Sequence, residues 1–283
     1  MTPEEYCAAQ VNKSRSSFRL SFLLLNRERQ QAIHALYAFC REVDDIVDDV
    51  DENDDPAATK QLLDDWRSEI NSLYQGSPTH PIGHALLPAI QAYNLSKNHL
   101  MAIIDGMEMD LEKSRYANFD ELYLYCYRAA GVVGLLVAKI FGYQDPHTEE
   151  YAEALGIALQ LTNILRDVGE DLERDRIYIP QDELARFGLS DATLLYPENI
   201  ERLIPLFESM KTRAESYYQK ALTSLPTVDR KAQLSGLVMG AIYHALLKQI
   251  TAENYPVLSK RVRLSTPGKL VTTLKYLLTR RYG

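Results

Sequence analysis

Cysteine is scarce in this chain of 283 residues, which has three, Cys7, Cys40 and Cys126. They are far apart and odd in number, so they form neither a disulfide framework nor a zinc-binding spacing. A reducing compartment is therefore favoured. The six histidines show no metal-binding spacing either, and we expect them to pack in the core or to lie at the surface.

Long hydrophobic runs are also missing. The longest cover about residues 20–25 and 131–138, well short of the roughly 20 apolar residues that span a bilayer. The first residues, Met1 to Glu5, lack the basic and apolar regions of a signal peptide. We therefore expect a cytoplasmic protein that is at most peripheral at the inner face of the membrane.

The net charge of −8 argues against nucleic acid as a partner. This charge is unevenly distributed, because acidic residues are dense between positions 42 and 65 whereas none follows Glu253. The last part of the chain carries cations instead: Lys260, Arg261, Arg263, Lys269, Lys275, Arg280 and Arg281.

Strand-like alternation and Gly/Ser-rich or Pro-rich linkers are absent from the sequence, and the hydrophobic pattern is helical nearly throughout. Capping residues indicate helix starts at Asp55-Pro56, Ser96, Asn118 and Asp145-Pro146. The runs they open extend to about residues 74, 112, 141 and 171, and further runs cover 198–225, 228–253 and 267–280. The sequence predicts one all-α domain over residues 1–283.

An acidic stretch ends the helical run that begins near Arg27. Within it, Tyr37, Arg41, Asp44 and Asp48 are spaced so that they share one stripe of a helix with about 3.6 residues per turn. Like charges one turn apart destabilise a helix by roughly 0.2–0.5 kcal/mol per pair, so a bound cation would relieve them. Carboxylate oxygens suit a hard cation such as Mg²⁺, which water and substrate phosphate then complete.

A second stripe lies on a run that is apolar around most of its circumference, from Tyr151 to Val168. Such a helix is expected at the centre of a bundle. Its polar side chains would cost free energy there unless they are paired, coordinated or facing water. They fall on one face, at a spacing similar to that of the first stripe: Gln160, Asn163, Asp167 and Asp171.

Other interpretations of these carboxylates are weaker. A solvated acidic helix end would explain the first stripe by itself, but it does not explain carboxylates on a buried helix. A di-iron bundle needs Glu-x-x-His on two helices, and no glutamate here has a histidine three residues later. No G-x-G-x-x-G signals a nicotinamide site. The abundant tyrosines, 18 in all, are either packing residues or the wall of a cavity that stabilises a carbocation.

Four segments resemble the squalene/phytoene synthase family. The two signature segments are residues 37–48 (YAFCREVDDIVD) and 160–171 (QLTNILRDVGED), and residues 125–134 (YCYRAAGVVG) and 176–180 (RIYIP) resemble further parts of the family. The resemblance runs from about Tyr6 to Arg263. It implies an isoprenoid synthase fold, a single helical bundle around a deep apolar cavity, that takes two prenyl diphosphates with Mg²⁺, or Mn²⁺ in its place.

The resemblance also implies roles for particular residues. Asp44 and Asp48 resemble the first metal-binding pair, whereas Asn163, Asp167 and Asp171 resemble the second metal and diphosphate site. The catalytic set would be Asp44, Asp48, Asp167, Asp171, Tyr37 and Arg41. Positions that the family uses around the diphosphates are Tyr37, Arg41, Gln160, Asn163, Arg166 and Tyr243, together with the N-terminal segment Ser14, Arg15, Ser16 and Ser17.

Within the family, the opening residues, the Arg41-Glu42-Val43-Asp44-Asp45 form, the short length and the Arg261–Ser265 tail are most similar to bacterial presqualene diphosphate synthases of hopanoid biosynthesis. These join two farnesyl diphosphates, and NADPH is not expected. The alternatives are a phytoene or dehydrosqualene synthase, or a squalene synthase that uses NADPH. A helical prenyl-lipid carrier without activity is the alternative outside enzymes.

The C-terminal run offers a surface for a partner. An apolar face lies beside Lys269, Lys275, Arg280 and Arg281, a pattern that suits an anionic membrane surface. Packing of an ordinary helix on the domain explains the pattern equally well. Downstream isoprenoid enzymes are further candidate partners. The face consists of Leu270, Val271, Leu274, Leu277 and Leu278.

Overall fold

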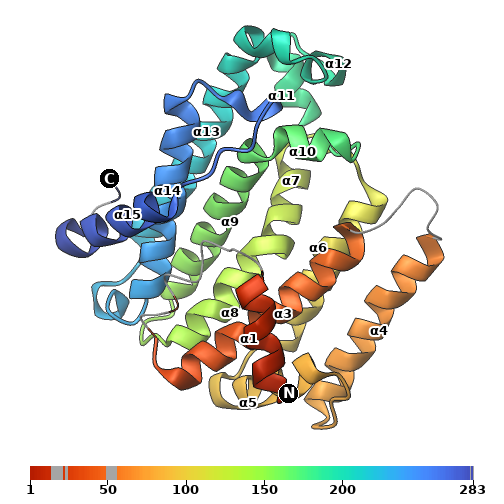
Figure 1. The fold of residues 1–283 in the computed structure, drawn as a ribbon, viewed down its shortest axis with the longest axis vertical. Coiled ribbons are helices and arrows are strands. Elements are labelled where there is room, and N and C mark those ends of the chain that lie inside the picture. The colour runs from red at the N-terminus through yellow and green to blue at the C-terminus, as the bar shows by residue number, and fades with distance from the viewer. Residues whose placement is uncertain (14–21, 23–24, 49–55, 281, 283) are drawn as a thin grey trace.

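The computed structural model describes residues 1–13, 22, 25–48, 56–280 and 282. Helices dominate these residues and no β-strand occurs among them, so the predicted all-α class is confirmed (Figure 1). The α-helices are α1 (Pro3–Lys13), α3 (Arg27–Asp48), α4 (Pro56–Tyr74), α5 (Pro81–Tyr93), α6 (Lys97–Glu112), α7 (Phe119–Cys126), α8 (Val132–Phe141), α9 (Thr148–Arg166), α10 (Val168–Glu173), α11 (Gln181–Arg186), α12 (Asp191–Leu194), α13 (Ile200–Ser224), α14 (Leu234–Ala252) and α15 (Thr266–Thr279).

Helix starts follow the capping signals in the sequence at several places. The side chains of Ser96, Asn118 and Ser265 accept hydrogen bonds from backbone N–H groups of the first turns of α6, α7 and α15. Each such bond satisfies an N–H group that has no partner inside the helix. The predicted starts at Ser96 and Asn118 are therefore confirmed.

Two predicted helical runs are wrong in their bounds. The run from Asp145 begins only at Thr148, because the chain first makes a turn in which the Thr148 N–H donates to the Asp145 carbonyl. It also breaks at Asp167, whose ψ of 9° ends α9 and separates it from α10. The run from residue 228 passes through a 3₁₀ turn first, and α14 begins at Leu234.

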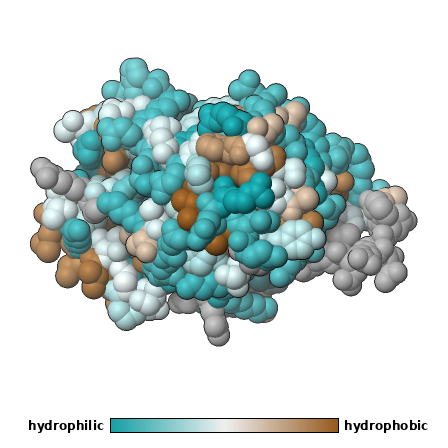
Figure 2. Space-filling model, turned by 90° about the horizontal axis from the view of Figure 1, so that it is seen from above, coloured by the Kyte–Doolittle hydropathy of each residue, from teal (hydrophilic) through white to brown (hydrophobic). Residues whose placement is uncertain are grey.

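Helix α9 lies at the centre of the bundle, as its apolar circumference predicts. It packs against α13, α8 and α14, and thirteen of its residues are buried. The face seen from above is mostly hydrophilic, and its apolar atoms gather near its centre and at the left edge (Figure 2).

Helices α8 and α9 cross at glycines that let their backbones approach closely. A Cβ on Gly134 would meet the Ala152 carbonyl oxygen at 2.2 Å, and one on Gly156 would meet the Ala130 carbonyl oxygen at 2.4 Å. Alanine at either position would push the two helices apart. The π-helical turn Tyr127–Gly131, which joins α7 to α8, brings Ala130 to this crossing.

The stretch Phe119–Phe141, formed by α7, the π-helical turn and α8, is long and apolar enough to cross a membrane, judged by length and composition alone. Half of its most apolar part is buried. It forms part of the protein core, where Leu136 and Ile140 are fully buried. The same length and composition are expected of a central helix in a large bundle, so this stretch does not by itself indicate a membrane span.

His244 on α14 gives the fold a pH dependence. Its ring packs against Tyr218 at 5.1 Å and Tyr282 at 5.7 Å, and its buried Nδ1 has no hydrogen-bond partner in the described part of the chain. Burial lowers the pKa of this imidazole to about 4. Because the unfolded chain takes up the proton near pH 6.5 and the folded one does not, stability should fall as pH drops from about 6.5 toward 4, by up to about 3 kcal/mol.

Urea unfolding at pH 7 and pH 5 measures this effect. We expect the His244→Phe variant to lose less stability between the two pH values than the wild type. The matched control is His84→Phe, at an exposed position of α5, which should keep the wild-type pH dependence. An equal loss in both variants would show that His244 does not couple folding to protonation.

Candidate active site

A cavity of about 510 Å³ lies between α3, α6, α8, α9 and α10. It brings together nine of the predicted site residues, which come from α3 and from α9 with the residues after it. Apolar side chains line the rest of the wall, among them Leu36, Val133, Leu155 and Leu159. The nine are Tyr37, Arg41, Asp44, Asp48, Gln160, Asn163, Arg166, Asp167 and Asp171.

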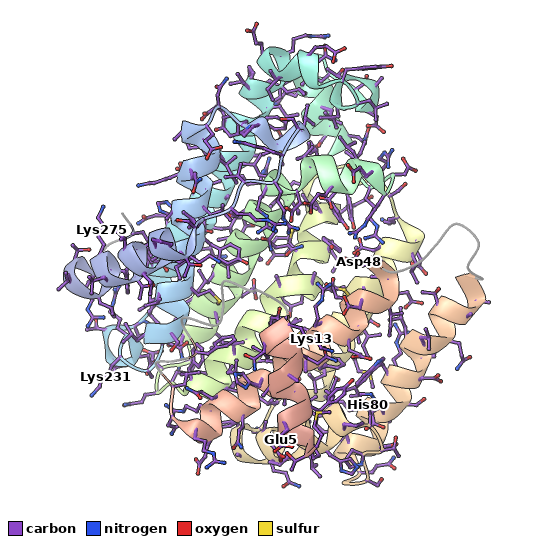
Figure 3. All side chains as sticks on the ribbon, in the orientation of Figure 1. Glu5, Lys13, Asp48, His80, Lys231 and Lys275 are labelled. Atoms are coloured by element: carbon purple, nitrogen blue, oxygen red, sulfur yellow. The ribbon has the colours of Figure 1, made fainter. Side chains whose placement is uncertain are left out.

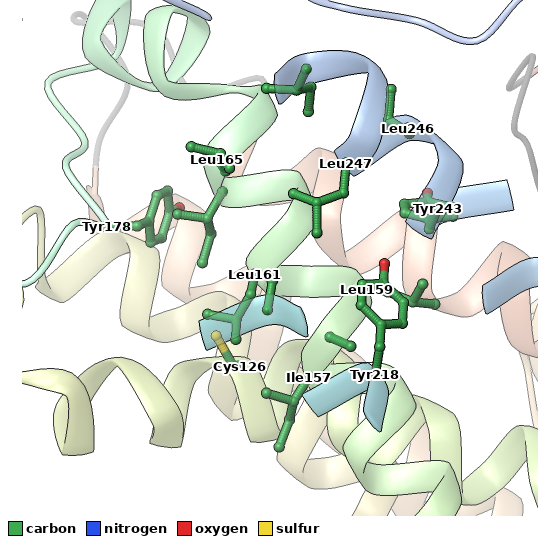
Figure 4. Packing of buried hydrophobic residues seen from close by; sticks show 14 of the residues in the cluster. Cys126, Ile157, Leu159, Leu161, Leu165, Tyr178, Tyr218, Tyr243, Leu246 and Leu247 are labelled. Carbon is green, nitrogen blue, oxygen red and sulfur yellow. The ribbon is translucent and has the colours of Figure 1, made fainter. Parts of the chain in front are cut away.

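The other predicted positions are not on this wall. Tyr243 is buried on α14 and hydrogen-bonds to Arg166, which is a wall residue. Figure 4 shows Tyr243 on the other side of α9 from Tyr178. Ser14, Arg15, Ser16 and Ser17 lie outside the described residues.

The stripe of α3 faces the cavity at the end of the helix, where Figure 3 labels Asp48. Asp48 accepts a hydrogen bond from Arg176 at 2.8 Å, and Arg174 lies 3.3 Å from its other oxygen. Asp44 is paired with Arg41 at 2.9 Å. Burial, together with the charge of Asp48, raises the pKa of Asp44 to about 7 even though Arg41 opposes the shift. A nearby cation would therefore strongly stabilise the ionised form of this carboxylate.

The two carboxylates that follow α9, Asp167 and Asp171, differ in their partners. Asp167 is ion-paired, with Arg166 at 2.7 Å and Arg261 at 2.9 Å. Asp171 takes part in no side-chain hydrogen bond or ion pair within the described ranges. Burial and the charges of Asp167 and Asp110 raise the pKa of Asp171 to about 8. One helical hydrogen bond persists across the break at Asp167, from the Asp171 N–H to the Asp167 carbonyl at 2.9 Å. The two carboxylates therefore stay on the same side of the chain, facing the cavity.

Asp110 on α6 is a wall residue that the sequence did not reveal. Its two oxygens accept hydrogen bonds from the hydroxyls of Tyr178 at 2.7 Å and Tyr125 at 3.0 Å. Burial raises its pKa to about 6. The signal for it is weak: Asp110 shares the buried face of α6 with Ile103 and Met107, and a lone carboxylate on an apolar face is easily taken for a helix end.

Three arginines on the cavity wall were also missed as site residues: Arg174, Arg176 and Arg261. Arg176 belongs to the segment 176–180 that carries part of the family resemblance. Arg261 comes from the loop before α15, and it contacts Asp167 and also Glu170 at 2.7 Å. Their charges suit a polyanion, whereas the carboxylates on the same wall suit a metal cation.

Three tyrosines, two on α7 and Tyr127 at the start of the π-helical turn, divide between the two expected roles. Tyr125 lines the cavity and stacks on Tyr178 with ring centroids 4.9 Å apart. Tyr123 and Tyr127 stack on each other instead, and Tyr123 also donates to Glu153 at 2.8 Å. One of the three thus belongs to the cavity, and the other two are packing residues.

The donor set fits a Mg²⁺ ion that is completed by substrate. No three His, Cys, Asp or Glu side chains in the described part of the chain are arranged to hold a metal by themselves. Mg²⁺ commonly takes one or two carboxylates and fills its remaining positions with water and phosphate. The Oδ1 atom of Asn163 is buried in this wall without a hydrogen-bond partner among the described residues. An oxygen of this kind, beside the carboxylates of raised pKa, suits a hard cation.

A helical bundle whose apolar cavity ends in carboxylates and arginines defines an α-helical isoprenoid synthase. The fold of a dehydrosqualene synthase solved with a ligand superposes with a TM-score of 0.88 and 27% identity, over 99% of this chain and 97% of that one. A squalene synthase, HpnC from Alicyclobacillus acidocaldarius, gives a TM-score of 0.68 and 26% identity over 89% of this chain and 94% of its own. The predicted isoprenoid synthase fold is confirmed.

Sequence comparison defines the family. The squalene/phytoene synthase family model matches residues 11–267. Phytoene synthase 2 of Solanum lycopersicum is 37% identical over 95% of this chain and 86% of its own length. The chain is 36% identical to the phytoene synthase of an Oncidium hybrid cultivar and spans 65% of that protein's length. The chain belongs to the squalene/phytoene synthase family, whose members are prenyltransferases that condense prenyl diphosphates head to head.

Proposed function

We propose that the protein joins two molecules of farnesyl diphosphate head to head to form presqualene diphosphate, with release of one diphosphate and one proton. One observation carries this proposal: two groups of carboxylates face a single apolar cavity together with Arg41, Arg166, Arg176 and Arg261. That arrangement takes a charged head group at one end and a hydrocarbon chain along the rest. The solved dehydrosqualene and squalene synthases support products built from two farnesyl units.

The side chains at the charged end of the cavity bind the diphosphate, and those of the apolar wall shield the reacting chains. Arg41 and Arg166 donate hydrogen bonds to diphosphate oxygens and hold the leaving group in place. Bound Mg²⁺ supplies the positive charge that makes diphosphate a good leaving group. The C–O bond of one substrate breaks, and its electron pair goes to the diphosphate. The apolar wall, including Leu155 and Leu159, keeps water away from the resulting allyl cation.

Carbon–carbon bonds then form between the two chains. The double bond of the second chain supplies its electrons to the cation, the cyclopropane ring closes, and the proton that is lost passes to a diphosphate oxygen. The stacked rings of Tyr125 and Tyr178 lie on the wall near Asp110, where their faces stabilise positive charge. The protein thus binds, orients and shields the reactants.

A second candidate is phytoene synthesis from two geranylgeranyl diphosphates. The names of the similar proteins favour it, since the tomato protein and the 15-cis-phytoene synthase of Synechocystis are 37% and 35% identical to this chain. The two candidates use the same charged end of the cavity and differ in the length of chain that the apolar end accepts.

A product assay tests the function and separates the candidates. Purified protein is incubated with Mg²⁺ and farnesyl diphosphate, with and without NADPH, and in parallel with geranylgeranyl diphosphate; products are identified by mass spectrometry. We expect presqualene diphosphate, persisting in the presence of NADPH. Squalene or dehydrosqualene would assign another reaction, and phytoene would favour the second candidate. Tight binding of farnesyl diphosphate without release of diphosphate would point to a carrier.

A further inference from the structure

Helix α15 presents an apolar stripe that no other part of the described chain covers. Leu270, Val271, Leu274 and Leu278 are 52%, 65%, 60% and 78% exposed. Their spacing puts them within about 100° of one another on the helix. Tyr276, which is 2% exposed and packs into the core, lies on the opposite side. The fifth predicted member of this face, Leu277, packs partly against the core instead.

This grouping is unusual for the molecule. The other large apolar side chains that are exposed in the described residues are distributed over several elements, such as Leu62 on α4 and Leu124 on α7, as is normal for surface hydrophobic residues. On α15 four of them occur within nine residues. Figure 2 shows apolar atoms gathered at its left edge, the side on which α15 lies in Figure 1. A contiguous apolar surface of this kind marks an interaction site.

The charge around the stripe indicates what covers it. Arg263, Lys275 and Arg280 are exposed, and none of them forms an ion pair within the described ranges. No acidic residue follows Glu253, although the whole chain has a net charge of −8. By contrast, Arg261 and Lys260 are already paired within the domain, with Asp167 and Glu253. The surroundings of the stripe are therefore locally cationic.

A second copy of the chain fits this surface poorly. A two-fold contact through α15 would bring the same patch of both copies together. The cations beside one stripe would then face those beside the other, with no carboxylate on this helix to balance them. An anionic lipid surface offers both partners that the helix lacks, because the acyl boundary takes the apolar stripe and the head groups take the cations.

We propose that α15 is a membrane-docking helix that holds the protein on an anionic bilayer. The helix follows the loop that carries Arg261 to Asp167 at the cavity wall. Docking goes beyond the proposed function, since it requires neither catalysis nor a particular chain length.

Vesicle sedimentation of the full chain, without substrate, tests the proposal. The probes are unilamellar vesicles of phosphatidylcholine alone and of phosphatidylcholine with a third of phosphatidylglycerol. We expect at least tenfold tighter binding to the anionic vesicles, lost with the Leu274→Ser/Leu278→Ser variant. The Lys275→Glu variant, which changes an exposed residue and should fold normally, is expected to weaken binding severalfold. The matched control is Leu62→Ser on α4, where a leucine is 51% exposed.

Three results would overturn the proposal. One is absence of wild-type binding to anionic vesicles, and another is equal binding of all variants. The third is a wild-type dimer, measured by light scattering, that the Leu274→Ser/Leu278→Ser variant converts to monomer, because a second copy would then cover the stripe. Since no turnover is measured, failure here leaves the proposed reaction untouched, and failure of the product assay leaves docking untouched.

Discussion

Replacing Asp171 by asparagine should nearly abolish product formation while making the cation-free protein more resistant to heat at pH 8. Asparagine keeps the shape of the side chain and removes a charge that faces Asp167 and Asp110. A lost electrostatic contact to a developing charge typically costs roughly 10²–10³-fold in turnover, and we expect a fall of at least that size. Turnover is measured as diphosphate release with saturating Mg²⁺.

The stability gain has a defined pH dependence. The pKa of Asp171 is raised from its unfolded value near 3.8 to about 8 in the folded protein. Between these values the folded state holds a proton that the unfolded state has released, so stability falls as pH rises through this window. At pH 5 the folded carboxyl is still neutral, but the unfolded one has already released its proton, so the variant should melt slightly higher there. At pH 8, with chelator present, the gain should be several times larger, at roughly 2–4 °C for each 1 kcal/mol.

The control for this pair of measurements is Glu150→Gln. It makes the same loss of one negative charge at an exposed position near the start of α9, whereas Asp171 lies on α10, beyond the other end of that helix. We expect wild-type turnover and no change in the difference between the melting temperatures at pH 5 and pH 8. Wild-type turnover in Asp171→Asn would show that this carboxylate has no part in catalysis.

The helices that carry the site could be predicted from the sequence because their signals are local. Capping by Ser96 and Asn118 acts within one turn, and the apolar circumference of 151–168 requires a central position. The two polar stripes, on α3 and on α9 with the residues after it, could be aligned by their period alone. That they face one cavity depended on the packing of the bundle, which the family resemblance anticipated.

The site residues that the sequence analysis missed are brought to the cavity by contacts between parts of the chain that are far apart in sequence. Asp110 becomes part of the site because Tyr125 and Tyr178 reach it from α7 and from the loop before α11. Arg261 joins it through a loop that follows α14. Neither position belongs to a periodic stripe of polar residues. The break of the helix at Asp167 was missed for another reason, since no proline or glycine precedes it and the bend depends on its tertiary contacts.

Tyr243 was assigned to the site by the resemblance alone. Its position was expected to lie around the diphosphates, and the structure places its ring behind Arg166. A buried hydroxyl that bonds to an arginine fixes the direction of the guanidinium. Its contribution in the absence of substrate is therefore to position a cation, which periodicity in a sequence cannot distinguish from direct contact.

Replacing Arg176 by methionine should destabilise the protein more than any other single arginine change discussed here. The guanidinium is 13% exposed and donates to Asp48 and to the Val47 carbonyl, each at 2.8 Å. Breaking a buried pair by removing one partner costs about 3–5 kcal/mol. We expect the lower end of that range, because Arg174 lies 3.3 Å from the other oxygen of Asp48 and offsets part of the loss. Chemical unfolding measures the difference.

Added Mg²⁺ distinguishes a packing defect from a charge defect. Arg176 also favours the ionised forms of Asp110 and Asp171, so its loss leaves several carboxylates facing the cavity with less positive charge. A divalent cation can replace that charge and should stabilise Arg176→Met more than the wild type. The matched control is Arg186→Met, where the arginine is 58% exposed and pairs with Glu183 at 3.0 Å. Glu183 keeps its second partner, Arg213, so this change should cost little stability. If Mg²⁺ stabilises both variants equally, Arg176 acts through packing, and the carboxylates do not form one electrostatic unit.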